Sequence, residues 1–162
     1  MDATTASTAA TFAAVFAALY AGHQVGDHWV QSSCQAADKG LKGSKGRWAC
    51  TRHVLGLTAT KAILLVGAVL VLGLHLSALG LVLGFAVDAG THWWADRRVT
   101  LARLARVTNK SEFLSLGTPA HQHHPVDAKG LYAPTLGTGA YALDQSFHVL
   151  FLFVAALIIA AV

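Results

Sequence analysis

The sequence has few charged residues for its length. Asp, Glu, Lys and Arg make up 12% of its 162 residues, whereas an ordinary soluble domain carries about 25%. Hydrophobic residues make up 54%, and the mean hydropathy is +0.51. This composition excludes a disordered tail and a coiled coil. The formal net charge is +4, but the basic residues are too few to cover a phosphate-tracking face, so no nucleic-acid partner is expected.

Cysteine is scarce as well, since Cys34 and Cys50 are the only two. The spacing Cys50-x-x-His53 resembles half of a zinc-binding motif, but no second pair follows, so no zinc finger is predicted. Both cysteines lie in a connection that we assign to the cytoplasm, where thiols stay reduced. The sequence also lacks a G-x-S-x-G motif, which disfavours a serine hydrolase.

Long apolar segments are what the sequence has in abundance. A helix that crosses a bilayer needs about 20 mostly apolar residues, and the predicted spans are residues 9–30, 53–74, 76–95 and 140–162. The first contains His23 and Asp27 and has no basic segment before it, so a span is favoured over a cleaved signal peptide. The predicted fold is an all-α membrane protein, with one four-helix transmembrane domain over residues 1–162.

The basic residues indicate how the spans are oriented. Nearly all Lys and Arg residues lie in two connections, residues 31–52 and 96–139, and the turn between the second and third spans has none. The positive-inside rule therefore places both connections in the cytoplasm and both termini outside. The third span is expected to continue as an amphipathic cytoplasmic helix, in which Leu101 and Leu104 recur among arginines. Basic clusters beside the spans favour contact with anionic membrane lipids.

Acids and histidines inside the spans are the most informative residues. A charged side chain at the middle of a membrane costs about 2.5–3.5 kcal/mol, so it needs a partner or a purpose. Each of three spans carries one Asp and one His four residues apart, which places both on one helix face. The pairs are His23 with Asp27, Asp88 with His92, and Asp144 with His148.

The predicted topology sorts these residues into two layers one helical turn apart. The layer nearer the outside contains His23, Asp88 and His148, and the layer nearer the cytoplasm contains Asp27, His92, Asp144 and His53. Mixed His and Asp ligands suit Zn, Mn or Fe, and the offset suits two adjacent ions bridged by a carboxylate. We predict a divalent transition-metal site of one or two ions with the six paired residues as ligands, and His53 as a ligand or a general acid/base.

Two other interpretations of these pairs stay open: hydrogen-bonded Asp–His pairs that only lock the helices together, and a proton relay. Neighbouring polar residues have two interpretations as well. Gln31 and Gln145 either orient ligands or are exposed interfacial residues. Arg97 and Arg98, which follow Asp96, either hold an anionic head group or are positive-inside anchors. A cluster of His121, His123 and His124 in the last connection is either a loose metal ligand set or an exposed turn without a role.

The combination of motifs resembles a known family. The motifs are His23-x-x-x-Asp27, Asp88-x-x-x-His92, Ala95-Asp96-Arg97-Arg98 and Leu143-Asp144-Gln145-x-x-His148. Together they are similar to an uncharacterised bacterial family, domain-of-unknown-function 3307, and most of all to its actinobacterial members. The resemblance implies an integral protein of the bacterial cell membrane and brings no established activity. In motif style it is also similar to membrane-bound metal-dependent hydrolases.

Three functions follow from these observations. The first is a metal-dependent hydrolase that acts on an ester or phosphoester of a lipid or lipid-linked substrate at the cytoplasmic leaflet. The second is a protein that binds or transports a divalent metal ion, although the outer halves of the spans offer no polar route. The third is a structural membrane component. The small size of the unit is also compatible with a homodimer.

Overall fold

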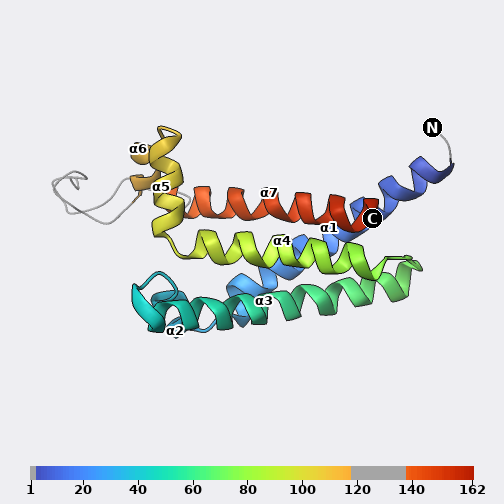
Figure 1. Ribbon diagram of the computed structural model, residues 1–162, viewed down its shortest axis with the longest axis horizontal. Helices are drawn as coiled ribbons and strands as arrows, with labels where there is room; N and C mark the ends of the chain where they lie inside the picture. Colours follow the sequence, from blue (N-terminus) through green and yellow to red (C-terminus); the bar gives the residue numbers. More distant parts are fainter. Residues whose placement is uncertain (1–2, 118–137) are drawn as a thin grey trace.

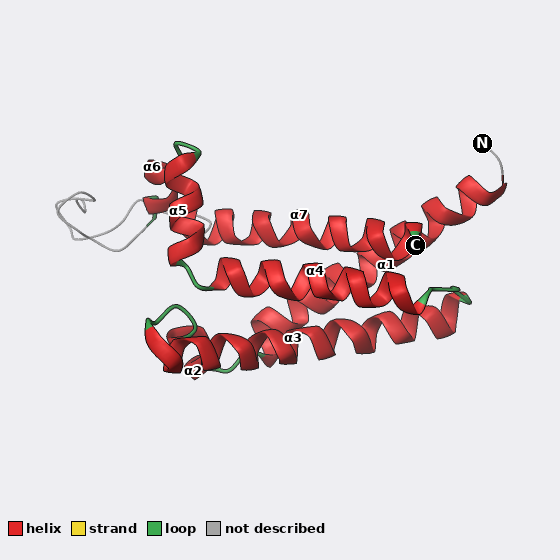
Figure 2. Cartoon of the chain, viewed as in Figure 1, coloured by secondary structure: helices red, strands yellow, loops and turns green. Residues whose placement is uncertain are grey.

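The computed structural model describes residues 3–117 and 138–162, and helices make up almost all of them (Figure 2). No strand occurs in these two stretches, so the all-α prediction is confirmed. The helices are α1 (Ala3–Val25), the π-helix η1 (Gly26–Val30), α2 (Ser33–Asp38), α3 (Gly43–Leu72), α4 (Ala78–Asp96), α5 (Val99–Val107), α6 (Ser111–Ser115) and α7 (Gly139–Ala161).

Four long helices make up the body of the molecule. α1 packs against α3 and α7, and α4 packs against α7 and α3. The short helices α2, α5 and α6 lie at one end, where α5 crosses the ends of α4 and α7, and the turn between α3 and α4 lies at the other end (Figure 1). Both long connections therefore leave the same end of the molecule. Their assignment to the cytoplasm stays a prediction.

Three helical segments are long and apolar enough to cross a membrane: Thr5–Val30, Gly43–Leu72 and Gly139–Ala161. α4 is not among them, because Asp88, His92 and Asp96 interrupt its apolar sequence. These three side chains are buried within the molecule. The second segment begins at residue 43 rather than at the predicted residue 53. The first turns of α3 pack against α2, Gly46 lies against Leu41, and Cys50 contacts the backbone of Trp93 in α4.

Local signals in the sequence explain where the helices begin and end. Ser32 caps α2 in a reciprocal arrangement with Gln35, and Ser77 and Thr138 cap α4 and α7 through their side-chain oxygens. Gly73 ends α3 in the left-handed conformation with φ of 63°, which glycine adopts without steric cost. The turn that follows is short and makes α3 and α4 antiparallel neighbours.

Small residues set how closely the long helices approach. A Cβ atom added at Gly22 of α1 would lie 2.7 Å from the Cα of Lys61 in α3, and one at Gly84 of α4 would lie 2.5 Å from Cγ1 of Ile159 in α7. Real Cβ atoms do not come so near to other atoms. The small residues therefore allow a close approach of the helices at both interfaces.

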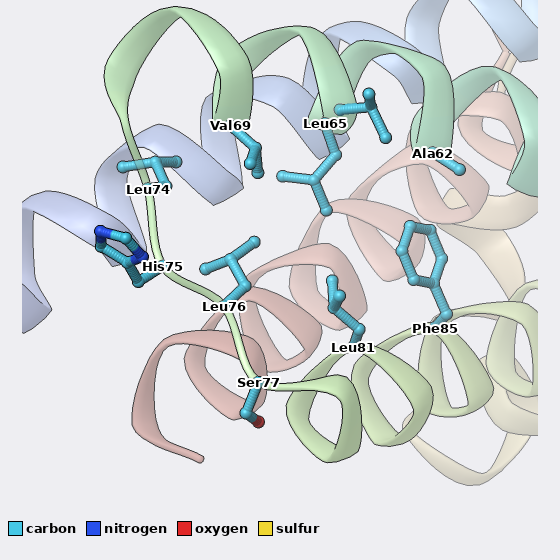
Figure 3. Close-up of a pocket in the computed structure, with 10 residues that line it drawn as sticks. Ala62, Leu65, Val69, Leu74, His75, Leu76, Ser77, Leu81 and Phe85 are labelled. Atoms are coloured by element: carbon cyan, nitrogen blue, oxygen red, sulfur yellow. The ribbon is translucent and has the colours of Figure 1, made fainter.

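The two ends of the bundle differ in chemistry. The end that holds the α3–α4 turn has an apolar core formed by Val15, Leu19, Leu65, Leu152, Ala155, Ala156 and Ile159. Beside this core is a cavity of about 680 Å³, lined mainly by aliphatic side chains and Phe85, with His75 at its edge (Figure 3). The buried acids and histidines all lie toward the opposite end.

Candidate metal centre

Four histidines and three aspartates gather near the end of the bundle that carries α2, α5 and α6. They are His23 of α1, Asp27 of η1, His53 of α3, His92 and Asp96 of α4, and Asp144 and His148 of α7. All four imidazoles are buried. Six of these seven residues were predicted as site residues, and the seventh, Asp96, was not.

The Nε2 atom of His53 is the point on which this cluster converges. It lies 3.1 Å from Oδ1 of Asp27, 3.2 Å from Oδ2 of Asp96 and 3.2 Å from Nε2 of His92. Nε2 of His92 lies 3.3 Å from Oδ2 of Asp96. Four potential ligand atoms from three helical segments thus face one small space. An imidazole nitrogen has one hydrogen or one lone pair, so hydrogen bonding alone cannot satisfy three such neighbours.

These separations resemble some edges of a tetrahedral metal site. Zinc binds imidazole nitrogen and carboxylate oxygen at about 2.0–2.2 Å, which makes the six edges of the tetrahedron about 3.3–3.6 Å long. The separations of 3.1, 3.2, 3.2 and 3.3 Å correspond to four of these edges and are at or slightly below that range. The buried His and Asp residues could therefore hold a metal ion.

Asp96 provides a second reason to expect a cation. Its side chain is 1% exposed. Oδ1 lies 2.9 Å from the ammonium group of Lys39, whereas Oδ2 has neither a lysine nor a well-formed hydrogen bond beside it. Buried polar atoms without such partners are costly. Its two oxygens face different histidines, because Oδ2 is close to His53 and His92 whereas Oδ1 lies 3.7 Å from Nε2 of His148. A carboxylate in this position can bind one ion or bridge two.

Two overlapping groups of three residues have donor atoms close enough together to hold a metal ion. One is Asp27, His53 and His92, and the other is His92, Asp96 and His148. His92 belongs to both, but it offers only one ligand atom to each. Its ring stacks on that of His148, with centroids 3.8 Å apart. The groups therefore form one continuous cluster rather than two independent sites.

The π-helix η1 positions Asp27. The backbone N–H of Gln31 donates to the carbonyl of Gly26 at 3.0 Å, which is the wider i to i+5 hydrogen bond of a π-turn. Gly26 makes room for this turn, since a Cβ atom there would lie 2.3 Å from Cδ1 of Leu57. Asp27 and Gln31 both face His53 as a result. Single π-turns in helical segments are frequent at functional sites.

Two glutamines support the cluster. The side-chain nitrogen of Gln31 lies 2.7 Å from Nδ1 of His53. A metal ion on Nε2 would leave Nδ1 with the ring hydrogen, which needs an acceptor. Rotating the amide by half a turn would place its oxygen at Nδ1 as that acceptor. Gln145 contacts His23 at 3.3 Å, and it donates to Asp27 at 3.1 Å and to Asp144 at 3.4 Å. Both glutamines thus have the orienting contacts that one of the two sequence interpretations predicted.

Asp88 lies apart from the cluster. Its carboxylate accepts a hydrogen bond from the ammonium group of Lys61 on α3, and both side chains are buried. Asp88 belongs to neither group of potential ligands found in the described residues. The layer in which the sequence predicted Asp88 instead contains three imidazoles, since the ring of His23 lies 5.4 Å from that of His92 and 5.3 Å from that of His148.

Asp96, and not Asp88, is the aspartate that pairs with His92 in the cluster. His92 and Asp96 are four residues apart and in the same order as His23 and Asp27, whereas α7, which runs the opposite way, has Asp144 before His148. The three pairs thus form a histidine layer and an aspartate layer. The matching order of His and Asp in the first and second pairs can be seen in the sequence. It was not used to predict Asp96 as a ligand, because the arginines after it indicated anchoring at the membrane interface.

A cavity of about 470 Å³ adjoins the cluster, and Asp27, Asp96 and Asp144 form part of its wall. Lys39 and Arg98 line the same cavity. The centre is therefore buried among the helices on one side and opens to a ligand-sized space on the other. The predicted histidines at positions 121, 123 and 124 lie outside the described residues.

Comparison with known proteins adds no relative, since no protein-family model, curated protein or solved structure matches the chain. The resemblance to domain-of-unknown-function 3307 therefore stays a prediction, and function must be argued from the centre itself.

Proposed function

We propose that the chain is a four-span protein of the bacterial cell membrane in which Asp27, His53, His92 and Asp96 bind one divalent transition-metal ion, Zn, Mn or Fe. We further propose that this centre hydrolyses an ester or phosphoester of a lipid or lipid-linked molecule at the cytoplasmic leaflet. The observation that carries the proposal is that three other potential ligand atoms, from Asp27, His92 and Asp96, all lie 3.1 to 3.2 Å from Nε2 of His53.

The groups around the centre suit hydrolysis. A bound divalent ion supplies a water molecule whose pKa is lowered toward 7. Nε2 of His148 lies 3.4 Å from Oδ2 of Asp144, and this pair adjoins the centre through Asp96. The two carboxylates stabilise a proton on Nε2 of His148, and His148 can donate this proton as a general acid. Gln31 and Gln145 hold the ligands in place, and the adjoining cavity has room for the reacting group of a substrate.

One ion accounts for the geometry better than two. The two groups of ligands share His92, whose Nε2 faces both His53 and Asp96. If that atom bound one ion, a second ion would have only Asp96 and His148 from its group. With one ion, His53 is a ligand, and the acid–base role that the sequence left open for it passes to His148. His23 then packs beside the rings of His92 and His148 and contacts Gln145.

Transport of a metal ion is a weaker candidate. A transported ion needs a polar route across the membrane, but the half of the bundle beyond Lys61 and Asp88 is filled by the apolar core around Leu19, Leu65 and Leu152. Among the described residues, the cavity that adjoins the proposed centre lies at the end that carries α2, α5 and α6. A purely structural role for the pairs predicts no metal at all, which makes it easy to test.

The test is elemental analysis of the purified protein in detergent, followed by activity assays. We expect one transition-metal ion per chain in the wild type, none in His53→Gln, and one in His75→Gln, whose exposed imidazole lies at the other end of the bundle. The three proteins are then assayed with lipid carboxylic esters and phosphoesters. The wild type and His75→Gln should hydrolyse the substrate, and His53→Gln should not. Wild-type protein that binds no metal after reconstitution would refute the proposal.

A further inference from the structure

Lys39 lies between the candidate metal centre and the adjoining cavity. Its Nζ atom is 2.9 Å from Oδ1 of Asp96 and 3.9 Å from Oδ1 of Asp27. The side chain is only 11% exposed, and it lines the cavity. A lysine is seldom buried to this extent without an anionic partner, so the carboxylates of the centre account for its position.

The backbone around Lys39 is held by two arginines at the corner between α4 and α5. The guanidinium group of Arg97 donates to the carbonyl oxygens of Lys39 and Leu41. Arg98 donates to the carbonyl of Ala36 at 2.8 Å, and its side chain packs over Gly40, where a Cβ atom would lie 2.7 Å from Cδ of Arg98. These contacts join the connection after α2 to the end of α4, so the ammonium group has a defined place beside Asp96.

The charge of the cavity wall depends on whether a metal ion is bound. The wall contains three carboxylates, from Asp27, Asp96 and Asp144, and two cationic groups, from Lys39 and Arg98. The side chains alone therefore carry a net charge of −1, and a divalent ion changes it to +1. A bound ion usually dominates the local field. The metal-loaded cavity consequently favours an anion, and Lys39 is the ammonium group nearest to Asp96 in the wall.

The rest of the cavity wall is apolar. Leu101 and Ala102 of α5, Leu114 of α6 and Ala140 of α7 line it. The volume of about 470 Å³ falls within the usual range for small-molecule sites. The cavity also lies at the end of helices that are long enough to span a membrane, where lipid head groups would be found. A ligand with an anionic head and an apolar tail matches both parts of the wall.

We propose that this cavity binds the phosphoryl group of an amphiphile, with Lys39 as the cationic contact and with binding dependent on the metal ion. The inference rests on the proposed function, because it names the substrate class of the same centre. It also assigns Lys39 opposite effects on two ligands. The lysine lies at Oδ1 of Asp96 and repels a metal ion bound at Oδ2, and it attracts a phosphate.

The test compares Lys39→Met with Lys45→Met, because Lys45 is an exposed lysine of the same connection that pairs with Asp38. Zinc is titrated into each protein by calorimetry, free zinc is removed by gel filtration, and inorganic phosphate or dihexanoyl phosphatidic acid is then titrated. We expect Lys39→Met to bind zinc at least as tightly as the wild type and to bind both phosphates about 10- to 100-fold more weakly. Lys45→Met should match the wild type in both titrations.

The two ligands distinguish a lipid head group from free phosphate, since the apolar wall should make the lipid bind more tightly. Equal affinities would overturn the amphiphile assignment. Loss of zinc and phosphate affinity together in Lys39→Met would show a structural role for the lysine and overturn the inference. A zinc-loaded protein that binds neither phosphate but hydrolyses a carboxylic ester would also overturn it, while leaving the proposed function intact. Failure to bind zinc at all would instead refute the proposed function.

Discussion

Two aspartates of α4 allow a matched test of where the metal binds. Asp88 and Asp96 lie on the same helix and are both buried, and each contacts a lysine, namely Lys61 and Lys39. Only Asp96 has an oxygen within 3.3 Å of two candidate imidazole ligands. Replacing each by asparagine keeps the size of the side chain and removes its charge. The two variants therefore differ mainly in whether the lost carboxylate belongs to the centre.

The expected loss of zinc affinity follows from the number of ligands that each substitution removes. Zinc sites with four protein ligands bind with about 10–16 kcal/mol, or about 2.5–4 kcal/mol per ligand. Each 1.4 kcal/mol is about tenfold in affinity. Because an asparagine oxygen still ligates weakly, we expect Asp96→Asn to bind zinc about 100-fold more weakly. Asp88→Asn leaves the ammonium group of Lys61 without its carboxylate, which costs about 3–5 kcal/mol of stability, but zinc affinity should be unchanged.

Competition with a chelator of known affinity measures zinc binding in detergent, and the midpoint of thermal unfolding reports stability. The expected pattern is weak zinc binding in Asp96→Asn and a lowered midpoint with normal zinc binding in Asp88→Asn. If Asp88→Asn lost zinc while Asp96→Asn kept it, the metal would lie one layer farther from the α5 end. The assignment of ligands made from these distances would then be wrong.

Three further predictions concern the surroundings of the centre. Gln31→Leu removes the amide beside the Nδ1 atom of a proposed ligand, and it should lower zinc affinity about 10- to 100-fold in a chelator competition without changing the number of ions bound. Gly22→Val should separate α1 from α3 and lower both thermal stability and zinc affinity, whereas Gly67→Val, where a Cβ atom meets nothing within 4 Å, should lower neither substantially. Removing the metal with EDTA should lower the midpoint of thermal unfolding. A free metal concentration of 100 times Kd stabilises the folded protein by about 2.7 kcal/mol. An unchanged midpoint would contradict binding of the metal to the folded state.

Much of the fold was predictable because apolar length is a strong signal. Segments 9–30 and 140–162 correspond closely to the helical segments Thr5–Val30 and Gly139–Ala161. The early start of α3 was not predicted, since the basic and glycine-rich residues 43–52 have no apolar run. These first turns of α3 pack against α2, and Gly46 lies against Leu41. Hydropathy along the sequence does not report such packing.

Helix periodicity predicted which site residues share a face of one helix, but not which residues of different helices contact one another. The spacing of four residues correctly placed His23 beside Asp27 and Asp144 beside His148. It could not decide whether His92 pairs with Asp88 or with Asp96, because both are four residues away. That choice depends on Lys61, whose ammonium group binds Asp88 across the α3–α4 interface. A lysine in an apolar span has no periodic partner in its own helix, so its contact could not be read from the sequence.

The order of the proposed ligands along the chain has a consequence for biosynthesis. Asp27, His53, His92 and Asp96 all precede residue 97, and the helices that carry them contact one another directly, α1 and η1 with α3, and α3 with α4. The whole ligand set has therefore been translated before α7 leaves the ribosome. Metal loading can then begin on a partly inserted chain, and α7 would add His148 and Asp144 to a centre that already holds its ion.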